Sequence, residues 1–169
     1  MANFYLVCGI GGGGKTILSK QIVAKNPGIV FMDADMYYER INGDECDRRN
    51  PFEVWHLIFR EIHEFEVAGK DVLLTANSLT LCQRNQFIEW FPSFKHHMIW
   101  VTAPWKVCVK GNASRRRNIP AKILKQQWKS MEPPYPFEKG WDTITQVSRD
   151  DNEYIVFNLK GNIKKFIKF

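Results

Sequence analysis

Continuous apolar runs alternate with segments of helical periodicity along the chain. Runs typical of buried strands lie at 4–8, 29–32, 71–75, 97–102 and 154–159, with a weaker one at 143–147. Helices are predicted to begin near Gly14, Met36, Pro51, Leu81, Pro104 and Pro120. This alternation predicts an α/β fold, with a parallel sheet of about five strands and helices on both of its faces.

The helix predicted from Pro51 is rich in aromatic residues. Asn50 is expected to cap its N-terminus and Gly69 to end it. Its apolar stripe consists of Trp55, Ile58, Ile62 and Phe65, with Phe59 beside it. We interpret this stripe as core packing against the sheet.

The loop after the first strand is glycine-rich. Residues 9–16 fit the pattern G-x-x-x-x-G-K-[ST], with a strand before them and a helix after them. Glycines let successive backbone N–H groups converge on an anion, and the helix N-terminus adds its dipole. Lys15 is expected to reach the β- and γ-phosphates of ATP, and the Thr16 hydroxyl to ligate Mg²⁺. The predicted nucleotide-binding residues are Gly9, Gly11, Gly12, Gly13, Gly14, Lys15 and Thr16. The sheet is therefore expected to be of the P-loop NTPase type.

Length and composition are those of an ordinary globular protein. The 169 residues suit one domain over 1–169, and 44% of them are hydrophobic. No apolar run approaches the ~18 residues that span a bilayer, and the N-terminus lacks a signal-peptide pattern. The cysteines, which show no metal-binding spacing, are Cys8, Cys46, Cys82 and Cys108. We expect reduced thiols and a cytoplasmic protein without membrane contact.

Charge is unevenly distributed along the chain. The net charge is +6, and residues 33–71 hold eleven acids against five bases. Residues 105–129 hold eight bases and no acid, and the tail 160–169 holds four lysines and no acid. This pattern indicates either a surface for polyanions, such as phosphates or a nucleic-acid backbone, or a solvated lysine-rich helix face.

An acidic pair follows the second strand. Asp33 and Asp35 lie where open α/β sheets bind their ligands, at the carboxyl end of a strand. Phosphoryl transfer to a hydroxyl needs one carboxylate that takes the proton. Asp35 is the candidate base, whereas Asp33 is more simply an N-cap of the next helix. If both face one cleft, their like charges should raise the pKa of one of them.

A helical segment at about 104–131 has the features of a lid. The short chain leaves little room for the switch or coupling machinery of GTPases and motors, so we predict a small kinase. The run Arg115-Arg116-Arg117 lies between two predicted helices. One arginine, with Arg115 and Arg116 preferred to Arg117, is expected to close over the phosphates and neutralise transition-state charge.

At these residues the chain resembles the 5′-hydroxyl polynucleotide kinase domain of phage polynucleotide kinase. The likeness covers 6–38, including Ala24-Lys25-Asn26-Pro27-Gly28, and returns from Ala103-Pro104-Trp105 to Lys129-Ser130-Met131. It is fainter in the third strand and at 138–142.

The resemblance implies transfer of the ATP γ-phosphate to a 5′-hydroxyl end of DNA or RNA. Lys15 and Thr16 would serve ATP and Mg²⁺, Asp35 would activate the hydroxyl, and a lid arginine among 115–117 would stabilise the phosphates. We expect kinase activity alone, because 169 residues leave no room for the C-terminal phosphatase domain of that family.

Three positions depart from the family pattern. The family has an arginine that helps to bind the acceptor phosphate, but this chain has Tyr38 at that position, and Arg40 is out of register. The family also has an aspartate at the end of the third strand, whereas the corresponding segment 75–77 of this chain has no acid. Gly13 stands where serine is usual, which removes a side-chain contact and adds flexibility.

Three other functions remain open. A P-loop kinase of a sugar, nucleoside or other small metabolite uses the same parts. Asp33-Ala34-Asp35 also fits the DxD of an aspartyl phosphatase, although Tyr37 is unusual there and the P-loop would go unexplained. A degenerate module that binds nucleotides or nucleic-acid ends without turnover is the third.

Overall fold

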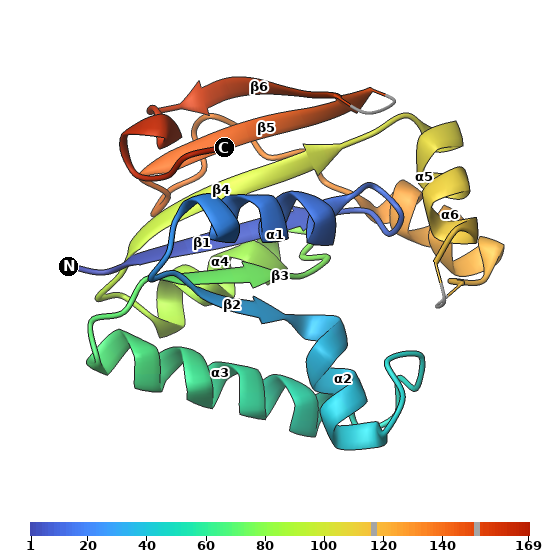
Figure 1. The fold of residues 1–169 in the computed structure, drawn as a ribbon, viewed down its shortest axis with the longest axis horizontal. Helices are drawn as coiled ribbons and strands as arrows, with labels where there is room; N and C mark the ends of the chain where they lie inside the picture. The colour runs from blue at the N-terminus through green and yellow to red at the C-terminus, as the bar shows by residue number, and fades with distance from the viewer. Residues whose placement is uncertain (116–117, 151–152) are drawn as a thin grey trace.

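The computed structural model describes residues 1–115, 118–150 and 153–169. Its described strands form one sheet in the order β2-β3-β1-β4-β5-β6 (Figure 1). These are β1 (Asn3–Gly9), β2 (Val30–Asp33), β3 (Val72–Thr75), β4 (Lys95–Thr102), β5 (Thr143–Asp150) and β6 (Glu153–Lys160).

The sheet is mixed rather than wholly parallel. The pairings from β2 to β5 are parallel, so the α/β prediction is confirmed, but β6 runs antiparallel to β5. Only two residues separate these two strands, and a parallel pair would need a crossover of about a dozen residues or more. The strand predicted at 154–159 is therefore present as β6, but its antiparallel direction was not predicted.

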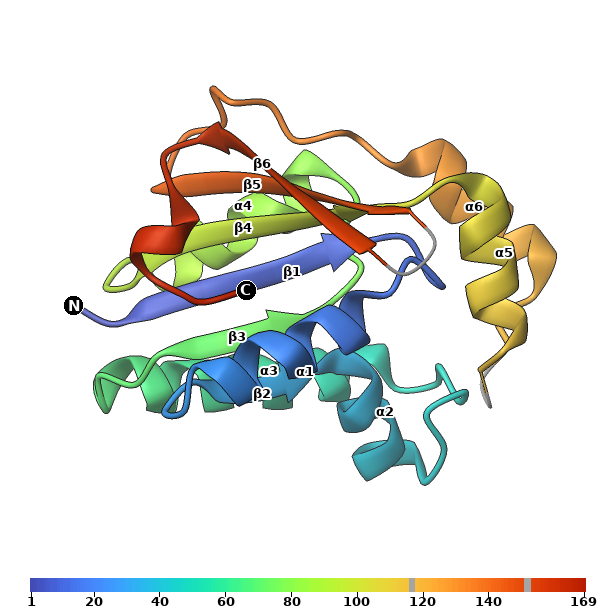
Figure 2. The same cartoon turned by 45° about the horizontal axis from the view of Figure 1, so that its top comes forward.

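Helices cover both faces of the sheet (Figures 1 and 2). They are α1 (Lys15–Lys25), α2 (Ala34–Asn42), α3 (Pro51–Val67), α4 (Leu81–Trp90), α5 (Trp105–Ala113) and α6 (Ala121–Ser130). Tyr5 and Val7 of β1 pack on the side of α1, whereas Phe4 and Leu6 pack on the side of α3 and α4. Successive strand residues point to opposite faces, so β1 is buried on both. Among the described helices, none combines the length and apolarity needed to cross a membrane.

The start of α3 differs from its prediction. Asn50 occupies the N-cap position with a φ of +56°, and its side chain makes no capping hydrogen bond within the described chain. Its Nδ2 instead donates to Asn42 Oδ1 at 3.2 Å. Pro51 holds the first helical position as expected, and the helix ends at Val67, two residues before Gly69.

The basic tail docks at the end of the sheet opposite to α5 and α6 (Figure 1). A 3-10 turn, η1 (Ile163–Lys165), places Ile163 and Ile167 in the core on the side of α1. Lys168 N donates to Asn26 Oδ1 at 2.9 Å, and Asn26 Nδ2 donates to Lys168 O at 2.8 Å. The tail thus lies far from the P-loop.

The parallel strands direct their following loops to one end of the sheet. There α2 continues directly from β2, and α5 and α6 lie beyond β1 and β4 (Figure 2). The glycine-rich loop after β1 and the polar segment after β3 belong to the same end. This is the position where open α/β sheets bind ligands.

Candidate active site

The loop between β1 and α1 is packed backbone against backbone on α5. Gly12 has a φ of +76°, and a Cβ there would lie 2.1 Å from the Cys108 carbonyl oxygen. A Cβ on Gly111 of α5 would lie 2.3 Å from the Gly12 carbonyl oxygen. Both the left-handed φ and the close approach require glycine. Helix α5, the first helix of the predicted lid, is therefore packed directly against the P-loop.

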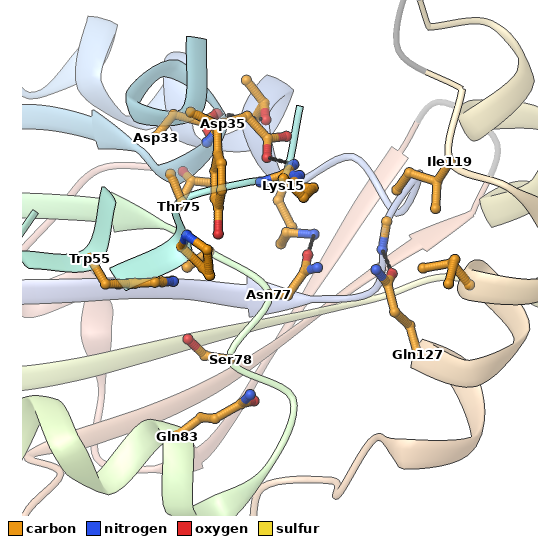
Figure 3. Close-up of a pocket in the computed structure, with 18 of the residues that line it drawn as sticks. Lys15, Asp33, Asp35, Trp55, Thr75, Asn77, Ser78, Gln83, Ile119 and Gln127 are labelled. Atoms are coloured by element: carbon orange, nitrogen blue, oxygen red, sulfur yellow. Dashed lines mark hydrogen bonds and ion pairs between the residues drawn. The ribbon is translucent and has the colours of Figure 1, made fainter. Parts of the chain in front are cut away.

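Lys15 at the start of α1 is turned back into the loop (Figure 3). Its Nζ donates to Gly9 O at 2.8 Å, to Ile10 O at 2.9 Å and to Asn77 Oδ1 at 3.2 Å. Burial lowers the pKa of Lys15 to about 8, and the charge of Arg115 acts in the same direction. An anion placed beside Nζ would replace neutral acceptors with a charged one, which makes a stronger hydrogen bond.

Thr16 and Asp33 form a second polar contact beside the P-loop. Thr16 Oγ1 donates to Asp33 Oδ2 at 2.9 Å. Asp33 is also the N-cap of α2, because its Oδ1 accepts the Asp35 N–H at 3.1 Å. Burial raises the pKa of Asp33, and the charge of Asp35 adds to the effect. Burial is the main cause of this rise in pKa, and the hydrogen bond from the Asp35 N–H opposes it.

Asp35 lies in the first turn of α2 (Figure 3) and is paired with a cation from the next loop. Arg48 Nη2 donates to Asp35 Oδ1 at 2.5 Å, and the Arg48 guanidinium lies 4.0 Å from the centroid of the Tyr38 ring. Tyr38 stands where the family has its arginine. Arg48, ten residues later in sequence, thus places a cation beside Asp35.

A cavity of about 950 Å³ connects these groups. At its P-loop end lie Lys15, Asp33, Asp35 and Asn77 (Figure 3), and Thr16 and Arg115 also line the cavity. The other end is lined by aromatic side chains of α3 and α4. The structure therefore gathers Gly11, Lys15 and Thr16 of the P-loop, the candidate base and one lid arginine around a single space.

The loop that carries the lid arginines is closed by one asparagine. Asn112 Nδ2 donates to Ile119 O at 2.8 Å, and Ile119 N donates to Asn112 Oδ1 at 2.9 Å. This pair of hydrogen bonds joins the end of α5 to the segment before α6. Arg115, two residues after the end of α5, lines the cavity. Arg116 and Arg117 lie outside the described residues, so the role predicted for Arg116 stays a prediction.

The lid also touches the P-loop from α6. Ile10 packs with Ile119 and Leu124 in a small buried cluster. Gly11 N donates to Gln127 Oε1 at 3.2 Å (Figure 3). A backbone N–H of the P-loop is thus paired with a lid side chain.

Three further residues at the P-loop were missed by the sequence interpretation. Asn77, in the segment where the family has an aspartate, accepts the Lys15 hydrogen bond and holds the loop through Gly9 N→Asn77 O at 3.0 Å. Arg149 of β5 and Tyr154 of β6 reach Gly14, with Tyr154 Oη donating to Gly14 O at 3.5 Å. Only the polar character of residue 77 at a strand end signalled Asn77 in advance, and nothing local signalled the other two.

Comparison with known families identifies the chain. A family model described as an AAA domain (AAA_33) matches residues 5–134. The chain belongs to this family. It is a P-loop kinase-like domain, and the predicted fold and phosphotransferase class agree with this family. No curated protein matches the chain.

Solved structures share the fold at low sequence identity. An unliganded sugar kinase from Janibacter sp. HTCC2649 has 18% identity and a TM-score of 0.67, covering 88% of this chain and 86% of its own. A chain of the Pnkp1/Rnl/Hen1 RNA repair complex has 10% identity and a TM-score of 0.67, covering 76% of this chain and 43% of its own. Kti12 from Chaetomium thermophilum in complex with ADP-AlF3 has 12% identity and a TM-score of 0.65, covering 89% of this chain and 91% of its own.

Proposed function

We propose that this chain is a kinase that transfers the γ-phosphate of ATP to the 5′-hydroxyl end of DNA or RNA. The observation that carries the proposal is the single cavity that holds Lys15, Asp35 and Arg115 at the carboxyl ends of the strands. A chain of an RNA repair complex among the structural neighbours and the basic lid support a nucleic-acid acceptor.

Each residue has a role in this proposal. Lys15 exchanges its carbonyl partners for phosphate oxygens. Thr16 and the Asp33 carboxylate behind it are hard oxygen ligands that fit Mg²⁺, which neutralises phosphate charge when it is bound. A lid arginine, Arg115 or Arg116, neutralises charge on the transferring group.

Asp35 is assigned to the proton transfer. As the acceptor oxygen bonds to the γ-phosphorus and the bond to the ADP oxygen breaks, the hydroxyl proton passes to the Asp35 carboxylate. Arg48 positions that carboxylate through its hydrogen bond to Oδ1 and its stacking on Tyr38.

The pKa of Lys15 predicts a pH dependence of ATP binding. Only the protonated amine attracts phosphate, and the free protein loses this proton above pH 8. The Kd for Mg·ATP should therefore rise about tenfold from pH 7 to pH 9. Lys15→Arg is the matched control, because a guanidinium stays charged; it should bind more weakly but with a flat profile. A flat wild-type profile to pH 9 would contradict the assignment.

Two lysine stripes on the lid are suited to a polyanionic acceptor. Lys122, Lys125 and Lys129 are exposed at helical spacing along one face of α6, and Lys106 and Lys110 are exposed on α5. Lysines that contact phosphates make binding depend on salt, because counterions are released.

Salt dependence therefore tests the acceptor class. If three phosphates are contacted, raising salt from about 50 to about 200 mM should weaken oligonucleotide binding on the order of tenfold. Replacing Lys122, Lys125 and Lys129 by alanine should flatten this dependence. Replacing Lys164, Lys165 and Lys168 in the distant tail is the charge-matched control and should leave it unchanged.

The deciding assay compares acceptors. The protein is incubated with γ-labelled Mg·ATP and either a 5′-hydroxyl oligonucleotide or a panel of sugars, nucleosides and other small alcohols. Label on the oligonucleotide supports the proposal. Label on a small alcohol alone would make the chain a metabolite kinase, and tight ATP binding without transfer would leave a binding module.

A further inference from the structure

The cavity end remote from the P-loop is lined by a set of aromatic side chains. These side chains, called here the aromatic wall, are Phe52, Trp55, His56 and Phe59 of α3 and Trp90 of α4. The stripe that the sequence assigned wholly to the core is thus divided. Its isoleucines, Ile58 and Ile62, are fully buried against the sheet, whereas Trp55 and Phe59 are only partly buried. The other rings of the wall, on Phe52, His56 and Trp90, are exposed.

The rings of the wall hold one another in place. Phe52 and His56 are stacked with centroids 6.2 Å apart and an interplanar angle of 17°. Phe59 contacts Trp55 at 5.6 Å and Trp90 edge-on at 4.6 Å. Phe52 is nevertheless 82% exposed and Trp90 53% exposed. Core packing does not explain this exposure. The exposed rings form a preformed apolar surface that is open to a ligand.

We propose that the aromatic wall binds the nucleobase of the nucleotide that carries the acceptor hydroxyl. This inference rests on the proposed function and specifies its substrate class. The wall lines the same cavity as Asp35, so a ligand that presents a hydroxyl to the carboxylate can extend toward the rings. Arg48 and Arg115 line this cavity too, so its lining is basic as well as aromatic.

The chemistry of the wall favours a base over a sugar. A nucleobase offers a flat π-face, and stacking on an aromatic side chain is worth about 1–3 kcal/mol per base. A sugar ring needs many hydrogen-bonding groups, but the wall side chains contain only indole and imidazole nitrogens as polar atoms. Because every base has a π-face, the wall should accept all four bases with only a modest preference.

Alanine variants at two exposed rings, one on each helix, test the wall. Phe52→Ala and Trp90→Ala should raise KM for a 5′-hydroxyl oligonucleotide roughly 5- to 150-fold, with kcat and KM for ATP within about twofold. Phe137→Ala is the matched control, because Phe137 is 89% exposed and does not line the cavity. Melting temperatures of the three variants show whether each still folds.

An acceptor that lacks its 5′-terminal base measures how much the stacking of that base on the wall contributes to binding. On an oligonucleotide with an abasic 5′-terminal nucleotide, wild type, Phe52→Ala and Trp90→Ala should have the same KM. Equal losses on the complete and the abasic acceptor, or no loss on either, would overturn the proposal.

A binding measurement separates this inference from the proposed function. Free adenosine and uridine should quench the tryptophan fluorescence of the wild type, and Phe52→Ala, which keeps all six tryptophans, should weaken that quenching. Such quenching without phosphate transfer to any nucleic acid would support the wall and refute the nucleic-acid kinase. Transfer to complete and abasic acceptors with equal KM would support the nucleic-acid kinase and refute the base-binding role of the wall.

Discussion

Asp35→Asn is expected to lower kcat for phosphate transfer by about 10²- to 10⁴-fold, which is the usual contribution of a positioned general base. The substitution keeps the shape of the side chain and an oxygen that can accept from Arg48, but it removes the ability to take the proton. The Kd for Mg·ATP should stay within about twofold, because Lys15 is held by hydrogen bonds to Gly9, Ile10 and Asn77. The measurements are steady-state kinetics with saturating acceptor and direct nucleotide titration.

Asp47→Asn is the matched control for this loss. Asp47 lies in the loop after α2 and pairs with Arg49 at the surface, outside the cavity lining. It should retain wild-type kcat. An Asp35→Asn protein that keeps more than a tenth of wild-type kcat would remove Asp35 from the role of base and direct attention to Asp33.

Glu138→Ala is expected to lower the free energy of unfolding by about 3–5 kcal/mol, because it leaves a buried guanidinium without its partner. Arg84 Nη2 lies 2.5 Å from Glu138 Oε1, and the two side chains are 1% and 3% exposed. Arg84 Nη1 also donates to Leu79 O at 3.1 Å and to Glu132 O at 2.9 Å. The pair therefore fastens α4 to the segment after β3 and to the chain that leaves α6.

Urea unfolding of Glu138→Ala and Glu64→Ala measures this difference. Glu64 pairs with Arg60 on the exposed face of α3, and the two side chains are 64% and 58% exposed. Exposed pairs contribute about 1 kcal/mol or less, so Glu64→Ala should be close to wild type. Equal midpoints and slopes for the two variants would contradict the importance of the buried pair.

The parts of the site that follow from local sequence were predicted correctly in position. The P-loop lies between a buried strand and a helix because its motif is contiguous in the chain. Asp33 and Asp35 end β2 and begin α2, so their proximity to the loop follows from the parallel strand order. Their catalytic and metal-binding roles remain predictions.

The rest depends on contacts between distant segments. Arg48 lies in an irregular loop whose sequence has no periodicity, so its pairing with Asp35 was not predictable. Apolar spacing showed that Trp55 and Phe59 lie on the inner side of α3, but not that both also line the cavity. The direction of β6 and the docking of the tail likewise depend on partners far away in the chain.

The central claim is that a 5′-hydroxyl of nucleic acid accepts the phosphate. Two oligonucleotides of one sequence, one with a 5′-hydroxyl and one already 5′-phosphorylated, are incubated separately with γ-labelled Mg·ATP and wild-type protein. We expect label on the first alone, and a phosphatase that removes terminal phosphates should release it. Label on both oligonucleotides, or on neither while a small alcohol becomes labelled, would contradict it.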